Sequence, residues 1–221
     1  MKPHKRLVLL IVVGTSVLFL VVGPVGISIF LNLRQERDEG LLNAARSGER
    51  KEVATLLAAG ADPNVRDVLE DPSPSLWQHV VEVFTHSHTS HVALARTALS
   101  LACENRHAAE IVPLLLDKGA NLKEDEVSEQ PSLPIAAHRG DVATVRILLQ
   151  HGADINIRDG LRLSVLQNAV SSDNPELVRL LLDQGAKVEG SFQGPSRTNS
   201  KNYETIRQMI ENATNGKFAP K

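Results

Sequence analysis

Short apolar stretches rich in leucine recur along the chain, and each one ends in a glycine and an alanine. The four copies lie at residues 56–62, 114–121, 147–154 and 180–187. Gly119 and Gly152 are 33 residues apart, and Gly152 and Gly185 are again 33 apart. A fixed period of this length is typical of a solenoid, in which each unit buries its apolar face only against its neighbours. The pattern therefore predicts a stack of units that presents an extended surface.

Units with this period and these Gly-Ala ends resemble ankyrin repeats, and the resemblance implies two short helices in each unit, joined by a tight turn. The expected helices are 132–137 and 142–150 in the third unit, and 164–170 and 175–183 in the fourth. The pair Asn174-Pro175 favours a helix start, because asparagine can cap the first turn and proline fits its opening position. The glycine that closes each leucine-rich stretch is expected to end the second helix in a left-handed conformation.

Residues 39 to about 190 resemble ankyrin repeats, through these helix pairs and their Gly-Ala ends. The resemblance implies two antiparallel helices per unit and a β-hairpin-like loop to the next, so the expected fold is an all-α ankyrin-repeat solenoid of about four repeats. The family's Thr-Pro-Leu-His start is degraded, at residues 39–42, 97–100, 131–134 and 164–167. No unit keeps the histidine, so the hydrogen bonds that it usually makes between units must be replaced or absent. The second unit also carries an extra residue near Asn105, and Pro113 falls inside its second helix.

A run without formal charge, residues 7–33, precedes the repeats and follows a basic tail at 1–6. A bilayer core needs roughly 20 apolar residues in a helix. We therefore expect a single transmembrane helix at 7–33 that serves as an uncleaved signal anchor. A cleavable signal peptide is the alternative, with the small residues Gly26 and Ser28 before a possible cut.

The orientation of this segment depends on basic residues that lie on both of its sides. Lys2, Lys5 and Arg6 precede it, and Arg34 and Arg37 follow it. Their count does not decide the orientation. Because the compact basic tail is typical of an export signal, we expect a single-pass membrane protein whose repeat domain lies on the non-cytoplasmic side.

The repeat domain is expected to span residues 41–190 and to sit close to the membrane. The linker at 34–40 can span at most about 25 Å when extended. After the period stops, residues 191–221 are expected to form a capping helix and a tail, with Tyr203, Ile206 and Ile210 on one face of that helix. A solenoid needs such a cover for its last apolar face, although a separate binding helix is an alternative.

An insertion at about residues 68–96 interrupts the period between the first and second units. Leu76, Trp77, Val80, Val81 and Phe84 recur in it at helical spacing, and Trp77 is the only tryptophan of the chain. Aromatic anchors dominate the energetics of protein interfaces, so this helix is a candidate contact for a partner. It could instead fold back and cover the first two repeats.

The same insertion contains a histidine cluster at His86, His88 and His91, with His79 seven residues before the first of them. Imidazoles bind zinc or copper when three or four ligands share a fixed geometry. A secreted or envelope metal-binding protein that uses this cluster is therefore the alternative function, although a polar loop explains the same residues and we expect no metal site.

Composition narrows the remaining function classes. The net charge is −2 and the isoelectric point is near 6.4, so the chain has no electrostatic footprint for nucleic acid. Cys103 is the single cysteine, which excludes an intrachain disulfide. No phosphate loop, nucleophile elbow or dinucleotide fingerprint occurs. We therefore expect no catalytic residues, no cofactor and no enzyme activity.

The expected function is a membrane-anchored ankyrin-repeat protein that mediates an interaction with an unidentified protein partner. The partner-binding residues are expected at loop tips and in the insertion: Arg66, Asp67, Trp77, His79, Phe84, Lys123, Glu124, Arg158, Asp159 and Arg162. A structural or regulatory subunit whose insertion plugs a partner enzyme is a further alternative.

Overall fold

The computed structural model describes residues 31–67, 96–128, 130–189 and 202–215. Most of the expected transmembrane segment lies outside these residues, and so does most of the insertion, with Trp77, His79, Phe84 and the histidines at 86, 88 and 91. Among the described residues, no helix is long and apolar enough to cross a bilayer.

The described chain is mostly helical. It begins with a helix over residues 31–47. The elements that follow are α2 (Arg50–Ala58), β1 (Arg66–Asp67), β2 (Arg96–Thr97), α4 (Ala98–Cys103), α5 (Ala108–Asp117), α6 (Leu122–Glu126), α7 (Ser132–His138), α8 (Val142–Gln150), α9 (Val165–Ser171), α10 (Pro175–Asp183) and α11 (Tyr203–Thr214). The predicted all-α fold therefore needs one correction, because β1 and β2 form a short antiparallel pair with Arg66 opposite Thr97.

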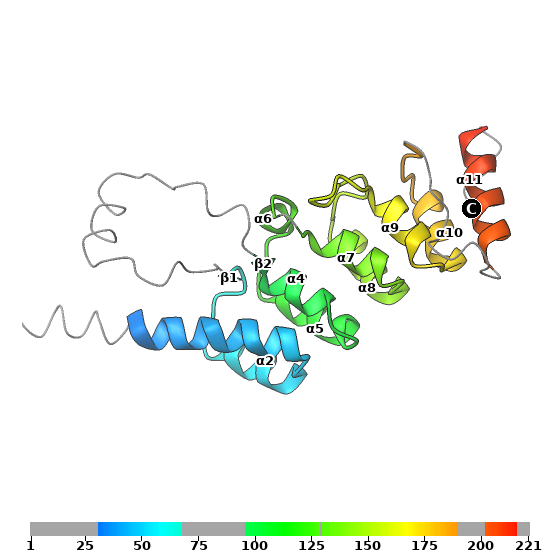
Figure 1. The fold of residues 1–221 in the computed structure, drawn as a ribbon. Helices are drawn as coiled ribbons and strands as arrows, with labels where there is room; N and C mark the ends of the chain where they lie inside the picture. The colour runs from blue at the N-terminus through cyan, green and yellow to red at the C-terminus, as the bar shows by residue number, and fades with distance from the viewer. Residues whose placement is uncertain (1–30, 68–95, 129, 190–201, 216–221) are drawn as a thin grey trace, which may run out of the picture.

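The helices form pairs that stack side by side along one direction (Figure 1). The first helices of successive units pack on one another, α4 on α7 and α7 on α9, and the second helices do the same, α2 on α5 and α5 on α8. The first helices are almost entirely buried and hold leucine and alanine at matching positions, such as Leu99 with Ala102 and Leu133 with Ala136. Small side chains let neighbouring helices approach closely, so one continuous core runs through the stack.

The helix ends follow the local signals in the sequence. The side chain of Asn174 accepts hydrogen bonds from the first turn of α10, and Pro175 opens that helix. Gly152 and Gly185 follow α8 and α10 with φ near +89° and +87°, which favours glycine over any residue with a side chain. Pro113 lies inside α5, as predicted.

Two segments differ from the sequence-based expectation. Residues 34–40, expected as an extended linker, are helical and belong to the same helix as Leu41 and Leu42. Residues 122–126, expected at a hairpin tip, form the short helix α6, which Asn121 caps by accepting a hydrogen bond from Lys123 N. Asn121 is a good cap residue, and this explains why the chain turns into a helix here.

The last helix covers the end of the stack. α11 packs on α10. Ile206 and Ile210 of α11 are buried on the side that faces α10. Asn202, just before α11, donates a hydrogen bond to the Asp173 carbonyl 2.9 Å away. The last repeat is therefore closed by a helix outside the 33-residue period.

The core makes a direct prediction about stability. Leu148 in α8 is fully buried, and its replacement by alanine removes apolar contacts and leaves a cavity. We expect Leu148→Ala to lower the free energy of unfolding by about 2–5 kcal/mol, measured by urea denaturation. Leu161→Ala is the control, because Leu161 is 81% exposed. Equal stability of the two variants would contradict the packing described above.

Candidate functional site

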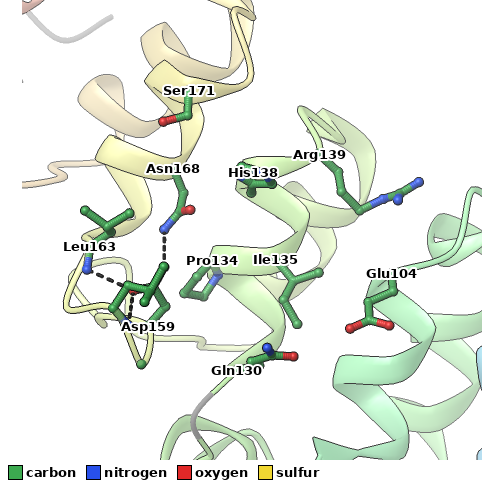
Figure 2. Close-up of a pocket in the computed structure, with 12 residues that line it drawn as sticks. Glu104, Gln130, Pro134, Ile135, His138, Arg139, Asp159, Leu163, Asn168 and Ser171 are labelled. Carbon is green, nitrogen blue, oxygen red and sulfur yellow. Dashed lines mark hydrogen bonds between the residues drawn. The ribbon is translucent and has the colours of Figure 1, made fainter. Parts of the chain in front are cut away.

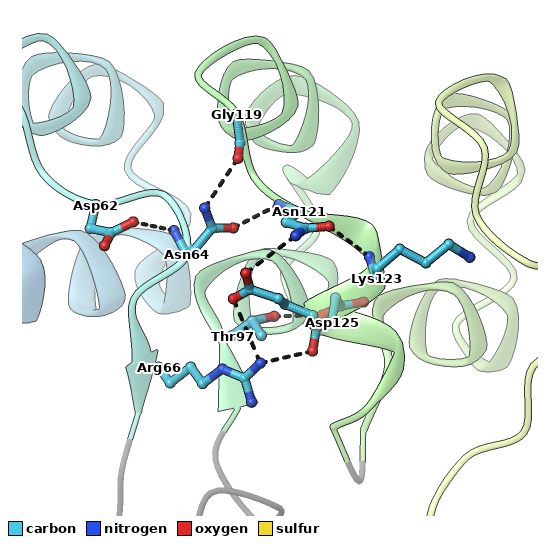
Figure 3. A network of polar contacts seen from close by, with 9 residues as sticks. Asp62, Asn64, Arg66, Thr97, Gly119, Asn121, Lys123 and Asp125 are labelled. Atoms are coloured by element: carbon cyan, nitrogen blue, oxygen red, sulfur yellow. Dashed lines mark hydrogen bonds and ion pairs between the residues drawn. The ribbon is translucent and has the colours of Figure 1, made fainter. Parts of the chain in front are cut away.

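The loops between units are tied together by a ladder of hydrogen bonds. The residue that follows Gly-Ala at each unit end donates its backbone N–H to a side-chain oxygen, which belongs to the preceding unit in three cases and to the helix over residues 31–47 in the first. The four bonds are Asp62 N to Asp38 Oδ1 (2.8 Å), Asn121 N to Asn64 Oδ1 (2.7 Å), Asp154 N to Glu126 Oε1 (2.9 Å) and Lys187 N to Asn156 Oδ1 (3.0 Å). Figure 3 shows the second of these bonds, beside the contact of Asn64 with the Gly119 carbonyl. The loops are therefore held at fixed positions relative to one another.

Helix α6 completes this ladder where the sequence departs from the pattern. Asn64 and Asn156 each lie two residues after the first residue of their loop, and the equivalent position in the second unit is Lys123. A lysine ammonium cannot accept a hydrogen bond. Glu126, at the end of α6, supplies the missing acceptor to Asp154 N.

Asp125, also in α6, joins the second and third units. It is only 2% exposed. The Thr97 hydroxyl donates to its Oδ1 at 2.5 Å, and Ser132 N donates to its Oδ2 at 2.7 Å. Burial raises the pKa of the Asp125 carboxyl, because desolvation of the charged form outweighs the hydrogen bonds from Thr97 and Ser132. This carboxyl connects the starts of α4 and α7 through these two hydrogen bonds. It therefore links neighbouring units, as the histidine that is missing from these repeats usually does.

Most of the described residues that the sequence places at loop tips are engaged within the chain. Arg66 Nη2 donates to the Glu124 carbonyl at 3.1 Å and lies 3.7 Å from the Glu124 carboxylate. Asp67 pairs with Arg46 at 2.6 Å. The Arg66 contact, drawn in Figure 3, joins the first and second units at the base of the hairpin that β1 and β2 form, and the Asp67 pair ties the same base to the helix over residues 31–47.

The loop before α9 is braced in the same way. Arg158 donates to Glu189 at 2.7 Å and to the Arg162 carbonyl at 2.8 Å. Asp159 accepts hydrogen bonds from the backbone of Leu161 and Leu163. Of the predicted tip residues, Lys123 is 72% exposed and bonds to Glu126, whereas the exposed Arg162 adopts a positive φ of 63°. The predicted partner contacts of these residues stay predictions.

A groove lies between this loop and the first helices. It has a volume of about 540 Å³ and crosses from the end of α4, over α7, to α9 (Figure 2). The lining residues come from three units: Glu104, Gln130, Pro134, Ile135, His138, Arg139, Asp159, Gly160, Leu161, Leu163, Asn168 and Ser171. Asp159 is the only one of them that the sequence singled out.

The charges in the groove are unequally compensated. Glu104 pairs with Arg96 at 2.6 Å. Asp159 Oδ2 accepts a hydrogen bond from the Asn168 amide at 2.9 Å, in addition to its backbone donors. Arg139 is exposed, and among the described residues its guanidinium has no ion-pair partner. The groove lining thus includes a guanidinium and the apolar side chains of Ile135 and Leu161.

The groove follows the repeat register, and that signal was available in the sequence. Glu104, His138 and Ser171 each lie five residues after the first leucine of their unit's first helix, Leu99, Leu133 or Leu166. The equivalent position in three successive units therefore faces one surface. The predicted partner-binding residues do not include this row of Glu104, His138 and Ser171. A repeat period identifies buried positions more readily than it identifies the exposed edge of a helix.

The described residues hold no cluster of three or more histidine, cysteine, aspartate or glutamate side chains that could bind a metal ion. The histidines at 86, 88 and 91 lie outside these residues, so the metal alternative is not tested. Cys103 is buried in α4, and burial raises the pKa of its thiol far above the usual range. A thiol in that position is a packing residue rather than a nucleophile.

Comparison with known proteins identifies the class of this fold. A family model described as ankyrin repeats in three copies matches residues 78–159, 99–191 and 133–213. Together these matches cover residues 78–213, which is more than half of the 221-residue chain. The chain therefore belongs to the ankyrin repeat family. Ankyrin repeats imply interaction with protein partners, and such domains are typically non-catalytic.

The chain matches individual relatives over only a part of their own length. The chain is 35% identical over 78 residues to a putative ankyrin repeat protein of fowlpox virus, and 35% identical over 86 residues to one of Rickettsia bellii. These stretches are 35% and 36% of this chain, and 12% and 36% of those proteins. The E3 ubiquitin-protein ligase KEG of Arabidopsis thaliana is 28% identical over 162 residues, which are 73% of this chain but 8% of that protein. Similar repeats thus also occur as parts of enzymes.

The bridge through Asp125 can be tested by its removal. Asp125→Ala leaves the buried Thr97 hydroxyl and Ser132 N–H without their acceptor, and each unpaired group costs about 1–3 kcal/mol. We expect a loss of about 2–4 kcal/mol in the free energy of unfolding. Glu124→Ala, which removes a half-exposed carboxylate that contacts Arg66 and the exposed Asn121 amide, should cost under about 1 kcal/mol. Urea titrations of both variants check this, and a parent-like Asp125→Ala would refute it.

Proposed function

We propose that this protein is a single-pass membrane protein whose ankyrin domain binds a protein partner through the groove over α4, α7 and α9, and that it catalyses no reaction. The observation that carries the proposal is the groove itself. One continuous hollow spans three units, and its lining includes Ile135, Leu161 and Arg139, whose guanidinium has no ion-pair partner among the described residues.

The bracing of the loops supports this assignment. A binding surface is more effective when its parts are held in place before the partner arrives, because ordering them on binding costs free energy. The loop that carries Leu161 is fixed by the contacts of Arg158 and Asp159. Leu161 itself stays 81% exposed, so a rigid loop presents an apolar side chain to the solvent. This combination fits an anchor point for a partner.

The membrane anchor rests on the sequence of residues 7–33. We propose that this apolar run spans the bilayer as a signal anchor, with the basic residues Lys2, Lys5 and Arg6 inside and the repeats on the non-cytoplasmic side. Trp77, His79 and Phe84 are proposed as additional partner contacts, because large aromatic side chains are common anchors at interfaces.

The groove proposal predicts a specific loss of binding. A photo-crosslinking residue at position 161 in the full-length chain should capture the partner, which can then be purified. We expect Leu161→Glu to weaken the affinity of that partner at least about tenfold, the equivalent of about 1.4 kcal/mol. The matched control is Val127→Glu, which introduces the same charge at a 68% exposed position outside the groove lining. Equal affinities of the two variants, measured by calorimetry, would place the binding surface elsewhere.

The anchor proposal is tested separately. We expect the full-length chain to stay with membranes after extraction at alkaline pH, because a spanning helix resists this treatment whereas a peripheral protein does not. Protease added to sealed inside-out vesicles should leave the repeats intact if they lie on the non-cytoplasmic side. Release of the chain at alkaline pH would exclude a spanning segment, and digestion of the repeats would reverse the orientation.

A further inference from the structure

The helix over residues 31–47 is the first element of the stack and also the element that follows the apolar run. It is continuous from residue 31, three residues before the first charged side chain, Arg34, to the buried Leu41 and Leu42. No turn or loop separates the two parts. Eight residues of helix separate Leu33 from Leu41, which corresponds to about 12 Å along the axis.

The part of this helix that was expected to be a linker is bound to the first repeat. Arg37 Nη1 donates to the Ala59 carbonyl at 2.7 Å, at the end of α2. Asp38 Oδ1 accepts from Asp62 N at 2.8 Å, and Arg34 Nη2 lies 3.3 Å from the Asp62 carboxylate.

The packing next to these contacts is equally close. A Cβ atom at Gly40 would lie 3.4 Å from Leu56 Cδ1 in α2, so the two helices are in tight contact at this point. The helix over residues 31–47 is therefore fixed to the first repeat along its length and has no free joint near its start.

Only the first turn of this helix exposes large apolar side chains. Leu31 is 56% exposed and Leu33 is 54% exposed. Two residues along an α-helix differ by about 200° around its axis, so these leucines point to opposite sides. A single packed neighbour on one side cannot cover both of them. A surrounding apolar medium can.

We propose that the first turn of the 31–47 helix enters the bilayer surface, so that the repeat stack is rigidly mounted on the membrane instead of being loosely tethered to it. The occupant of the surface around Leu31 and Leu33 is lipid. This inference rests on the membrane anchor proposed above. It adds that residues 34–37 lie at the headgroup level, and that the first repeat cannot move independently of the turn that enters the bilayer surface.

The mounting also determines which side of the stack faces the bilayer. The inter-unit loops directly precede the first helices of the units, α4, α7 and α9, and so lie at their amino-terminal ends. The membrane-proximal end of the 31–47 helix is its amino-terminal end too. The loops are therefore on the membrane side of the stack, and Figure 1 shows them along the same edge as the start of this helix.

The test uses a fluorophore attached to one introduced cysteine in the full-length chain, in phosphatidylcholine vesicles that contain a headgroup-nitroxide lipid as quencher. Glu36→Cys places the label on an exposed position near the start of the helix, and Lys51→Cys places it on an exposed position at the start of α2, at the opposite end of the helix pair. Cys103 is buried with a raised thiol pKa, so the parent chain should take up no label.

We expect the quencher to act several-fold more strongly on the label at position 36 than on the label at position 51. A ten-residue Gly-Ser insertion between Leu33 and Arg34 should abolish this difference, because it releases the helix from the bilayer. Similar quenching at both positions of the uninserted chain would overturn the rigid mounting, and so would a difference that survives the insertion. Disulfide-linked dimers through position 36 would show that a second copy, rather than lipid, covers the two leucines.

Flotation of the vesicles separates these outcomes from a failure of the anchor itself. If the chain does not float with the vesicles, it has no membrane segment, and both proposals fall. If it floats but position 36 is not preferentially quenched, the anchor stands and only the rigid mounting is wrong. Thermal melts of the labelled variants, expected to match the parent, establish that the exposed substitutions leave the fold intact.

Discussion

None of the helix pairs that the structure describes can bury its own apolar face, and that constraint governs the rest of the described fold. Each pair covers its neighbour, so α4 needs α7 and α7 needs α9. The same dependence appears in the polar contacts, because a side chain of one unit accepts the backbone N–H of the next in three successive pairs. Apolar contact supplies most of the stabilisation, whereas the directional hydrogen bonds fix the register in which the units meet.

This division of labour affects where a partner can bind. Charged residues at loop tips look available in the sequence, but Arg66, Asp67 and Arg158 bond to residues in neighbouring units. To recruit them, a partner would have to compete with those intrachain bonds. In the groove over the first helices, the Arg139 guanidinium has no ion-pair partner among the described residues, and the Leu161 side chain is 81% exposed, so a partner can use both without breaking an ion pair of the described stack.

The repeat period made the helix pairs, their ends and the buried leucines predictable from the sequence. Leu148, Asn174 and Gly185 all occupy the roles that their spacing implies. The repeat period does not predict α6, because four of its five residues are charged and form no apolar pattern. Its helix depends on where Asp125 and Glu126 find hydrogen-bond donors in other units. The groove was missed for a related reason, since a row of exposed side chains becomes a surface only after the units are stacked.

The insertion between the first two units shows how such a stack tolerates extra chain. Its ends are held together, because β1 and β2 pair and Thr97 both caps α4 and bonds to Asp125. The entropic cost of closing a loop grows only with the logarithm of its length, by about 0.6 kcal/mol per doubling. Extra residues at this point therefore cost little free energy, as long as the base of the hairpin stays paired. The contacts of Asp67 with Arg46 and of Arg66 with Glu124 lie at that base, so the residues nearest the insertion are the ones that secure the junction it interrupts.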